Sequence, residues 1–269
     1  MKLLLGSELA GFIKERQAHN VRSLKQSKGI FPKLAIIKTI DNPVIDLYVS
    51  LKRRYAEDIG IQVEVFRVNQ KEASSLLEQL NNDSSVHGII VQLPLEDPSE
   101  TDQLVNLVSP RKDVDALGEK AKFDPATPMA ILWLLSGFNV DLQGKKVVLV
   151  GRGKLVGAPL EKMLKASGVD VSVADSSTKD VAVMTREADI IVTATGRPAI
   201  LTSDMIKPGA VVVDAGVASE NGKTLGDVDK EVLEREDLTI TPEKGGVGPL
   251  TVCALFENVI RSAERTDNS

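Results

Sequence analysis

Short apolar segments alternate with helical segments along nearly the whole chain, and this alternation constrains the fold more than any other feature. The segments expected to form strands are 34–37, 61–66, 86–91, 146–150, 170–174, 190–194 and 210–214. The segments expected to form helices are 7–27, 43–58, 70–81, 98–108, 128–137 and 250–264. Strands that are apolar throughout and separated by helices are typical of parallel sheets covered on both faces. The sequence therefore predicts an α/β fold.

The length of 269 residues indicates two domains, each large enough to bury a core of its own. An irregular segment at 110–128, rich in Asp, Lys, Gly and Pro, is typical of a domain crossing. We predict one α/β domain over residues 1–125 and a second, Rossmann-like domain over 126–247. We assign the C-terminal helix, 248–269, to the first domain.

Composition excludes several classes of protein. The single cysteine, Cys253, rules out a disulfide framework or a zinc cluster within one chain and fits a reducing compartment. No apolar run approaches the roughly 18 residues of a membrane span. The net charge of -5, with 33 basic and 38 acidic residues spread evenly, offers no basic patch for nucleic acid, and aromatic residues for base stacking are scarce. These features predict a cytoplasmic protein that binds neither nucleic acid nor membrane.

Residues 241–251 contain three glycines and two prolines immediately before the last helix. Glycine permits positive φ or close backbone approach, and proline fixes φ, so this segment is expected to form a rigid loop. The loop could lie against a flat ligand, or it could be an ordinary helix entry. The segment alone leaves both interpretations open.

A phosphate-binding turn is predicted directly after the strand at 146–150. The sequence there reads Gly151-Arg152-Gly153-Lys154-Leu155-Val156-Gly157, and a helix follows. Small residues let the backbone approach a pyrophosphate, and a helix N-terminus offers free N–H groups with a partial positive charge. The glycine spacing is one residue longer than the usual dinucleotide fingerprint, so the position between a strand and a helix supports the interpretation. A tight turn without a ligand is the alternative.

Two charged residues near this turn favour different dinucleotides. Asp175 ends the following strand, where a carboxylate commonly binds ribose hydroxyls, whereas Arg152 suits the 2′-phosphate of NADP. Asp175 could instead cap the segment that follows it, and Arg152 could be a solvated loop charge. These residues leave the choice between NADP and NAD open.

A candidate pair for proton transfer lies on the helix at 43–58. Tyr48 and Lys52 are four residues apart, so they share one face of the helix. A lysine acts as an acid or base near neutral pH only when burial or nearby positive charge lowers its pKa, and a tyrosine can cover a ring and orient the amine. The alternative is a surface lysine whose stem lies along the helix.

Further polar residues lie in or near the first domain. Gln92 would emerge at the carboxyl end of a parallel strand, where α/β sites usually lie. Asp113 and Asp115 could hold the N–H groups of a heterocycle, bind a metal or cap a loop. We expect no metal, because His19 and His87 lie in no ligand-like cluster and are expected to be structural.

Six motifs occur in order along the chain. They are Tyr48-x-x-x-Lys52, Val91-Gln92-Leu93-Pro94-Leu95, Lys112-Asp113-Val114-Asp115, Gly151-Arg152 through Gly157-x-Pro159, Gly226-Asp227-Val228-Asp229 and Gly245-Gly246-Val247-Gly248-Pro249-Leu250-Thr251. Together they resemble the methylenetetrahydrofolate dehydrogenase/methenyltetrahydrofolate cyclohydrolase family. The resemblance implies oxidation of 5,10-methylenetetrahydrofolate with NADP, then hydrolysis of the methenyl product to 10-formyltetrahydrofolate, in a cleft between the two domains. It also implies a homodimer.

The resemblance implies roles for the matching residues. Lys52 would be the main cyclohydrolase residue and Gln92 would position it, while Tyr48 would stack on the folate and Asp115 would bind the pterin ring. The predicted catalytic residues are therefore Lys52, Gln92, Tyr48 and Asp115. The predicted substrate-binding residues are Tyr48, Val91, Leu93, Pro94, Asp115, Gly246, Val247 and Pro249. The predicted cofactor-binding residues are Gly151, Arg152, Gly153, Val156, Gly157, Asp175, Ser176, Thr195, Gly196 and Val217.

The chain departs from the family pattern at several positions. Gly153 stands where the family usually has serine and Asp175 where histidine is common, so NAD is the alternative cofactor. Ile45 stands where many members have serine, so the polar support for Lys52 is expected to be thinner. These departures leave the relative strength of the two activities open.

Three other functions are consistent with parts of the sequence. A dehydrogenase without cyclohydrolase activity, preferring NAD, is the nearest, but the retained Lys52 favours both activities. A two-domain dehydrogenase of a shikimate-like hydroxy acid would share the cofactor turn and leave the loop at 245–249 unexplained. A sensor without turnover would be stabilised by ligand. The predicted function is the bifunctional folate enzyme.

Overall fold

The computed structural model describes residues 1–220 and 223–265, and the chain divides into two compact units. The C-terminal unit comprises Thr127–Thr251 together with Met1–Ala10, and the N-terminal unit comprises Gly11–Ala126 and the chain from Val252 onward. The predicted domain bounds, 1–125 and 126–247, remain a prediction, and in the structure the first ten residues lie with the C-terminal unit. They join the C-terminal unit because β1 (Lys2–Leu3) pairs in parallel with β11 (Thr239–Ile240).

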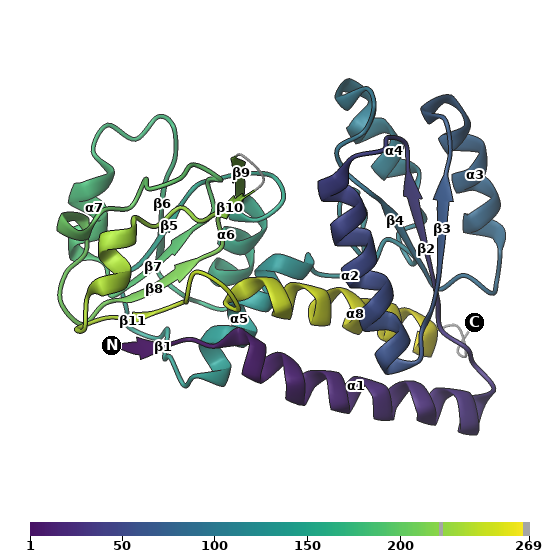
Figure 1. The fold of residues 1–269 in the computed structure, drawn as a ribbon, viewed down its shortest axis with the longest axis horizontal. Coiled ribbons are helices and arrows are strands. Elements are labelled where there is room, and N and C mark those ends of the chain that lie inside the picture. Colours follow the sequence, from purple (N-terminus) through teal and green to yellow (C-terminus); the bar gives the residue numbers. More distant parts are fainter. Residues whose placement is uncertain (221–222, 266–269) are drawn as a thin grey trace. The chain divides into compact units, whose positions relative to one another are not determined.

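The N-terminal unit is built on a three-stranded parallel sheet in the order β3-β2-β4 (Figure 1). The strands are β2 (Lys33–Lys38), β3 (Gln62–Arg67) and β4 (Gly88–Val91). The helices between and after them are α2 (Pro43–Ile59), α3 (Gln70–Asn82) and α4 (Thr101–Leu107). A 3₁₀ turn at Pro98–Glu100 precedes α4, so the single helix expected at 98–108 is two shorter elements.

The sheet of the N-terminal unit is buried because β2 is apolar on both faces. Leu34, Ala35, Ile36 and Ile37 are all fully buried. Successive side chains of a strand point to opposite faces, so Ala35 and Ile37 share one face. They pack against a cluster that includes residues of α3 and α4, among them Leu77. This arrangement explains why the strand reads as an uninterrupted apolar run.

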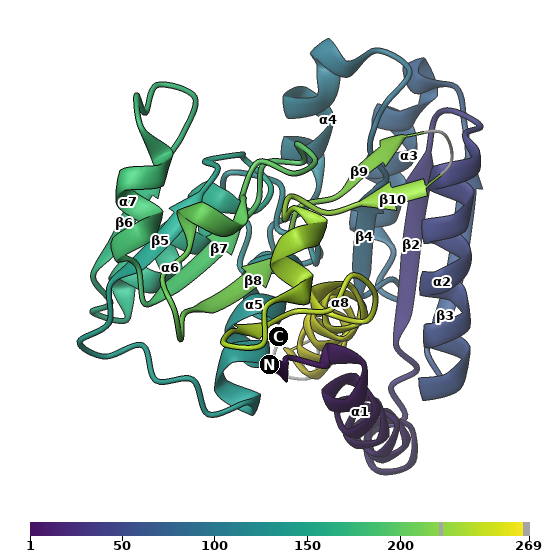
Figure 2. The ribbon, with the colours of Figure 1, turned by 60° about the vertical axis from the view of Figure 1, so that its left-hand side comes forward.

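The C-terminal unit is built on a six-stranded parallel sheet in the order β1-β11-β8-β7-β5-β6 (Figure 2). The remaining strands of this sheet are β5 (Val147–Val150), β6 (Val171–Ala174), β7 (Ile190–Thr193) and β8 (Val211–Asp214). The helices are α5 (Ala126–Gly137), α6 (Gly157–Ala166) and α7 (Val181–Glu187), with 3₁₀ turns at Ser203–Met205 and Lys230–Glu234. A small antiparallel hairpin joins β9 (Ala218–Glu220) and β10 (Lys223–Leu225). The fold class predicted from the sequence is confirmed.

Two long helices complete the chain, α1 (Gly6–Lys28) and α8 (Val247–Arg265). The sequence predicted the last helix to begin near 250, and it begins three residues earlier because Val247, Gly248 and Pro249 form its first turn. Proline is compatible with that turn, since its missing N–H would have no partner within the helix. Residues 266–269 of the predicted helix lie outside the described residues. None of the helices in the described residues is long and apolar enough to cross a membrane.

Candidate active site and dinucleotide-binding turn

Lys52 and Gln92 form the polar centre of the N-terminal unit. The ammonium Nζ of Lys52, on α2, donates a hydrogen bond of 2.8 Å to Oε1 of Gln92. Gln92 follows β4, its backbone N–H bonds to the carbonyl of Ile37, and its Nε2 donates to the carbonyl of Leu93 at 3.0 Å. The bond to Leu93 fixes the orientation of the amide, so the oxygen faces the lysine. Two residues forty positions apart are thus brought together at the carboxyl end of the sheet.

Burial and charge set the protonation of this centre. Burial lowers the pKa of Lys52, and the negative charge of Asp115 partly opposes that effect. Burial raises the pKa of Asp115, and the positive charge of Lys52 partly opposes that rise. The charges of Lys52 and Asp115 thus act on each other's pKa. A lysine with a lowered pKa is better able to take up and release a proton near neutral pH.

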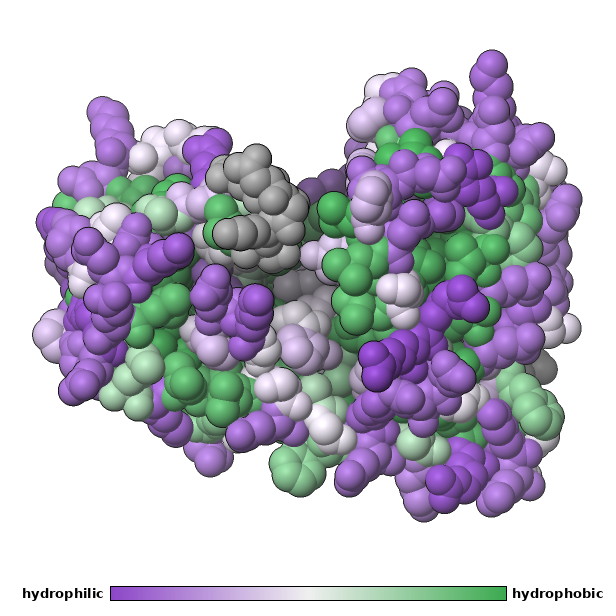
Figure 3. Space-filling view, in the orientation of Figure 1, coloured by the Kyte–Doolittle hydropathy of each residue, from purple (hydrophilic) through white to green (hydrophobic). Residues whose placement is uncertain are grey.

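Tyr48 lies on an exposed apolar face of α2. Val44, Leu47, Tyr48 and Leu51 are all exposed, and their spacing of three and four residues places them on one side of the helix. Figure 3 shows apolar side chains at the surface in the region of α2. Tyr48 is 41% exposed, so its side chain is available to a flat ligand.

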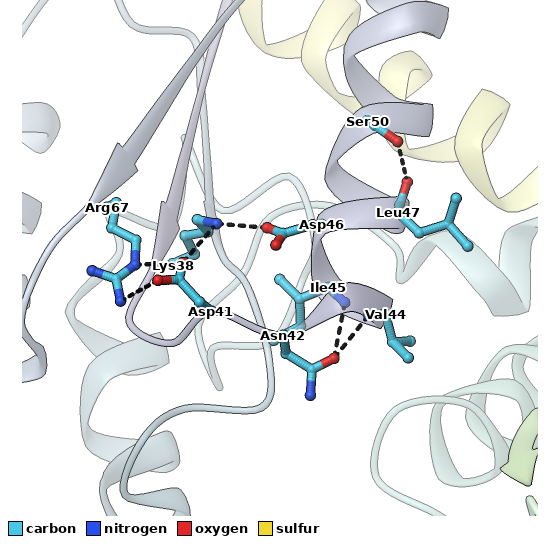
Figure 4. A network of polar contacts seen from close by, with 9 residues as sticks. All are labelled: Lys38, Asp41, Asn42, Val44, Ile45, Asp46, Leu47, Ser50 and Arg67. Carbon is cyan, nitrogen blue, oxygen red and sulfur yellow. Dashed lines mark hydrogen bonds and ion pairs between the residues drawn. The ribbon is translucent and has the colours of Figure 1, made fainter. Parts of the chain in front are cut away.

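The start of α2 is held by a network of polar contacts (Figure 4). Asn42 caps the helix by accepting a hydrogen bond from the backbone N–H of Val44 at 2.8 Å. Lys38, at the end of β2, contacts Asp46 at 2.5 Å and Asp41 at 3.2 Å, and Asp41 also pairs with Arg67. These contacts link the ends of β2 and β3 to the helix that carries Tyr48 and Lys52.

The two aspartates of the 112–115 motif have different environments. Asp113 is buried and accepts a hydrogen bond from the backbone N–H of Gly118 at 2.8 Å, so it holds the turn that follows it. Burial raises the pKa of Asp113 to about 6. Asn258 of α8 donates to the carbonyls of Val114 and Asp124, both at 2.9 Å, and fixes the same segment. Asp113 therefore caps the loop, and Asp115 is the carboxyl group that acts on Lys52.

The other predicted folate-site residues of the N-terminal unit surround Gln92 in the sequence. Val91 is the last, buried residue of β4, Leu93 packs against the core cluster, and Pro94 is exposed after a cis peptide bond. His87, which was expected to be structural, and the single cysteine are both buried in this unit. Nδ1 of His87 accepts a hydrogen bond from the backbone N–H of Lys33 at 3.3 Å, and the buried thiol of Cys253 contacts the hydroxyl of Tyr55 at 3.2 Å.

The turn after β5 has two glycines that the fold requires and one that it does not. Gly151 has a φ of 108°, and a Cβ there would lie 2.6 Å from the carbonyl oxygen of Ala194. A Cβ on Gly157 would lie 2.2 Å from the carbonyl oxygen of Gly151. A Cβ on Gly153 would meet no atom within 4 Å. Space therefore remains over Gly153 for a ligand or a side chain.

The helix after this turn is suited to an anion. Val156 occupies the N-cap position of α6 and makes no side-chain hydrogen bond to the helix. The N–H of Ala158 bonds to the carbonyl of Gly153 and Pro159 has no N–H, so it is mainly the partial positive charge of the helix N-terminus that favours a phosphate. Because the chain passes from β5 to β6 on one side and to β7 on the other, the turn lies at a topological switch point, where such sheets bind ligands. The residues present fit a dinucleotide.

The sheet brings the remaining predicted cofactor-binding residues to the same edge as this turn. Each of them follows the carboxyl end of a parallel strand, and the strands are neighbours. These residues are Asp175 and Ser176 after β6, Thr195 and Gly196 after β7, and Val217 after β8. Asp175 accepts hydrogen bonds from the backbone N–H and hydroxyl of Ser177 at 2.9 and 2.6 Å, so it stabilises its own turn as well as ending the strand.

Arg152 is paired within the protein. Its Nε donates to Oε2 of Glu161 on α6 at 2.9 Å, and its Nη2 lies 3.4 Å from Oε1 of the same carboxylate. From the sequence, Arg152 was expected to be a phosphate ligand or a solvated charge, and its pairing with Glu161 was not predicted. The available signal was the four-residue spacing between Glu161 and Lys165, which places a second cation on that carboxylate at 2.7 Å.

The buried Asp227 and the half-buried Asp214 organise the loops around the cofactor edge, and neither was given a role from the sequence. Asp227 accepts hydrogen bonds from the backbone N–H groups of Thr195 at 2.6 Å and Arg197 at 3.0 Å. Asp214 accepts from Gly216, Asp227 and Val228, and from the hydroxyl of Thr193.

Two glycines leave room for these carboxylates. A Cβ on Gly216 would lie 2.0 Å from the carboxylate of Asp227, and one on Gly226 would lie 2.1 Å from that of Asp214. A glycine that packs against an aspartate carboxylate thus occurs twice here, and neither pair was recognised from the sequence.

The glycine-rich loop at 245–249 belongs mostly to the backbone framework of the C-terminal unit. Gly245 has a φ of 85° and its carbonyl accepts from Ser7 at 2.9 Å, while Gly246 and Val247 are buried. Gly248 is exposed, and a Cβ there would meet nothing within 4 Å. Part of the loop is therefore structural, and the interpretation that the loop lies against a flat ligand stays a prediction.

These features define a two-unit α/β enzyme with a half-buried lysine site in one unit and a dinucleotide-binding turn in the other. Residues 4–115 match the family described as tetrahydrofolate dehydrogenase/cyclohydrolase, catalytic domain, and residues 125–267 match its NAD(P)-binding domain. The chain belongs to the tetrahydrofolate dehydrogenase/cyclohydrolase family. This confirms the predicted resemblance and the prediction of a bifunctional folate enzyme with a nicotinamide dinucleotide cofactor.

Individual relatives agree over the whole chain. The bifunctional protein FolD of Campylobacter jejuni is 41% identical over 283 aligned residues, with 100% of both chains covered. The crystal structure of the Campylobacter jejuni bifunctional enzyme FolD has a TM-score of 0.93 at 40% identity and covers 98% of this chain and 99% of its own. The Trypanosoma brucei dehydrogenase-cyclohydrolase, solved with NADP and an inhibitor, has a TM-score of 0.92 at 29% identity, covering 99% and 98%.

Proposed function

We propose that this chain oxidises 5,10-methylenetetrahydrofolate with NADP and hydrolyses the methenyl product to 10-formyltetrahydrofolate, with Lys52 as the central residue of the hydrolysis. The observation that carries the proposal is the 2.8 Å hydrogen bond between Lys52 and Gln92, in a site whose burial lowers the pKa of the lysine. A surface lysine would have neither feature. The dinucleotide, when bound, supplies the acceptor for the hydride of the one-carbon bridge.

The lysine acts on the proton of the attacking water. Addition of water to the methenyl carbon requires a proton to leave, and an amine with a lowered pKa can accept it. Gln92 holds the amine in place, because its own amide is fixed by the carbonyl of Leu93. Ile45 is a buried residue of α2 whose side chain has no polar group, so the support of Lys52 comes from Gln92 and from the charge of Asp115.

The folate itself is held by residues of different chemistry. Tyr48 offers an exposed ring on the apolar face of α2 for stacking against a flat heterocycle. Asp115 offers a carboxyl group for the N–H groups of the pterin. Val91, Leu93 and Pro94 place the backbone after β4 beside Gln92. The predicted contributions of Gly246, Val247 and Pro249 belong to the same proposal, with Gly248 added as the exposed glycine of that loop.

The cofactor assignment rests on the charges at the adenosine end. Arg152 supplies a guanidinium for the 2′-phosphate of NADP, and the Trypanosoma brucei relative was solved with NADP. Asp175 favours NAD, and so does Gly153, which stands where the family usually has serine. A dehydrogenase preferring NAD is therefore the second candidate. The pyrophosphate would lie over Gly153 at the N-terminus of α6.

A spectrophotometric time course with 5,10-methylenetetrahydrofolate tests the proposal. Reduced cofactor and methenyl product are followed separately, with NADP and with NAD, in a buffer that limits spontaneous hydrolysis. Reduced cofactor with only transient methenyl product is the expected result. Lasting accumulation of the methenyl product would mean that the protein has dehydrogenase activity without cyclohydrolase activity. No turnover by folded protein would overturn the assignment in favour of a sensor.

We also propose a cytoplasmic homodimer. Strand β6 lies at the edge of the six-stranded sheet and pairs, within the described residues, only with β5. A free edge offers unpaired backbone N–H and C=O groups to a second copy of the chain. Sedimentation analysis would give twice the chain mass of 29.0 kDa, and a monomer at all concentrations would contradict the proposal.

A further inference from the structure

Glu161 occupies an unusual position for a carboxylate beside a dinucleotide turn. Its side chain is only 10% exposed, although it lies in the second turn of α6, close to the site expected for the phosphates. It holds two cations, Arg152 at 2.9 Å and Lys165 at 2.7 Å. The hydrogen bond from Lys165 is the main reason why the pKa of Glu161 is lowered, with the charge of Arg152 adding to it. Glu161 is therefore ionised at neutral pH.

The contact with Glu161 occupies donors that a phosphate would need. A guanidinium recognises a phosphate through two parallel N–H groups. In this chain Nε and Nη2 of Arg152 both point to the carboxylate of Glu161. A 2′-phosphate must either displace Glu161 or use the remaining donors of Arg152 beside a fixed negative charge.

The local charge balance opposes a phosphate as well. The charge of Arg152 acts on Asp175, so the cluster consists of Arg152, Lys165, Glu161 and Asp175, two cations and two anions. These four side chains together offer no excess positive charge to a phosphate dianion, and Lys154 of the same turn is a further cation outside this set. NAD carries no 2′-phosphate and is unaffected by this balance.

We propose that Glu161 is a specificity-determining residue that restrains Arg152 and narrows the preference of this enzyme for NADP over NAD. The inference rests on the proposed dinucleotide site and deepens it. Because Lys165 also binds Glu161, the carboxylate keeps a partner when Arg152 turns to a phosphate. Lys165 thus lowers the free energy needed to release Arg152 from Glu161. Removal of Lys165 should therefore weaken NADP binding, whereas removal of the Glu161 charge should strengthen it.

The Glu161→Gln variant tests this directly. It keeps the size of the side chain and removes the charge, so NADP affinity is expected to rise about tenfold, the usual scale of one charge-assisted hydrogen bond, while NAD affinity stays unchanged. Calorimetric titration of the purified protein with NADP, NAD, 2′,5′-ADP and 5′-AMP measures the effect without turnover. The two nucleotide fragments differ by the 2′-phosphate, so their affinity ratio should change by the same factor.

Two further variants separate this explanation from a general change in the turn. Lys165→Met should lower NADP affinity and leave NAD affinity unchanged, because Glu161 then binds Arg152 alone. Arg152→Gln should abolish the effect of Glu161→Gln in the double variant. An unchanged NADP to NAD ratio in Glu161→Gln, with both dinucleotides still bound, overturns the inference alone. Failure of the folded parent to bind either dinucleotide overturns the proposed function and, with it, this inference.

Discussion

A Cβ atom on Gly6 would lie 1.9 Å from the carbonyl oxygen of Gly246, so α1 begins in direct contact with the backbone of the glycine-rich loop. The backbone N–H of Ser7 also donates to the carbonyl of Gly245. The start of the first helix and the loop before the last helix therefore support each other. The glycine at position 6 is required for this close approach, whereas its helical position alone would favour alanine.

We expect Gly6→Ala to destabilise the protein by about 1 to 3 kcal/mol, because the methyl group forces two backbone segments apart. Gly11→Ala on the same helix is the matched control, since a Cβ there meets nothing within 4 Å. That substitution should stabilise the protein by about 1 kcal/mol through helix propensity. Urea unfolding measures both. Equal effects of the two substitutions would contradict the contact between Gly6 and Gly246.

Asp227→Ala is expected to destabilise the C-terminal unit by about 2 to 4 kcal/mol, because the N–H groups of Thr195 and Arg197 lose their buried acceptor. Asp229→Ala, two residues away, is the control. Asp229 caps a short 3₁₀ turn through the N–H of Glu231, so its loss should cost about 1 kcal/mol. Thermal unfolding distinguishes the two, and a smaller effect for Asp227 than for Asp229 would remove Asp227 from its proposed role in holding the loop.

The cofactor turn should tolerate a side chain at Gly153 and reject one at Gly157. Gly153→Ser places a hydroxyl in open space, so the stability should stay the same and dinucleotide affinity should rise about fivefold through one added hydrogen bond. Gly157→Ala brings a methyl group against the carbonyl of Gly151 and should abolish binding. Dinucleotide titration followed by fluorescence tests both. A Gly157→Ala variant that binds the dinucleotide normally would contradict the close approach of Gly157 to the carbonyl of Gly151.

The pH dependence of methenyl hydrolysis should respond to charges around Lys52. Asp115 raises the pKa of Lys52, so Asp115→Asn removes that effect and should move the limb of the pH profile assigned to Lys52 to lower pH. Gln92→Glu places a negative charge beside Nζ, raises the pKa of the lysine and should move the same limb to higher pH. Opposite shifts are expected in a profile of kcat against pH. Shifts in the same direction would mean that the limb belongs to another group.

Much of the fold could be predicted because the strands of both sheets are short and continuously apolar. Residues 34–37 and 147–150 are apolar on both faces, and the structure buries them on both faces. The strands β1 and β11 were not predicted, since each has two residues and no detectable periodicity. Their pairing joins segments more than 230 residues apart, so no local pattern could have placed the N-terminus in the C-terminal unit.

The candidate site was predictable where a motif combined local order with an unusual composition. The Tyr48 and Lys52 pair and the turn at 151–157 could be found from spacing, and the resemblance linked them. The contacts of Glu161 and Asp227 could not be found in this way, because a helical glutamate and a loop aspartate are common on protein surfaces. Only the fold shows that Asp227 is fully buried and that Glu161 is nearly so.

Lys52→Met tests the central claim most directly. The variant keeps the length of the side chain and removes the amine, and Arg53→Met on the exposed side of α2 serves as the control. Measured in separate assays, methenyl hydrolysis by Lys52→Met should fall by roughly 100-fold or more, the usual contribution of a general acid or base, while NADP binding stays unchanged. Hydrolysis equal to that of the parent would contradict the proposed role of Lys52.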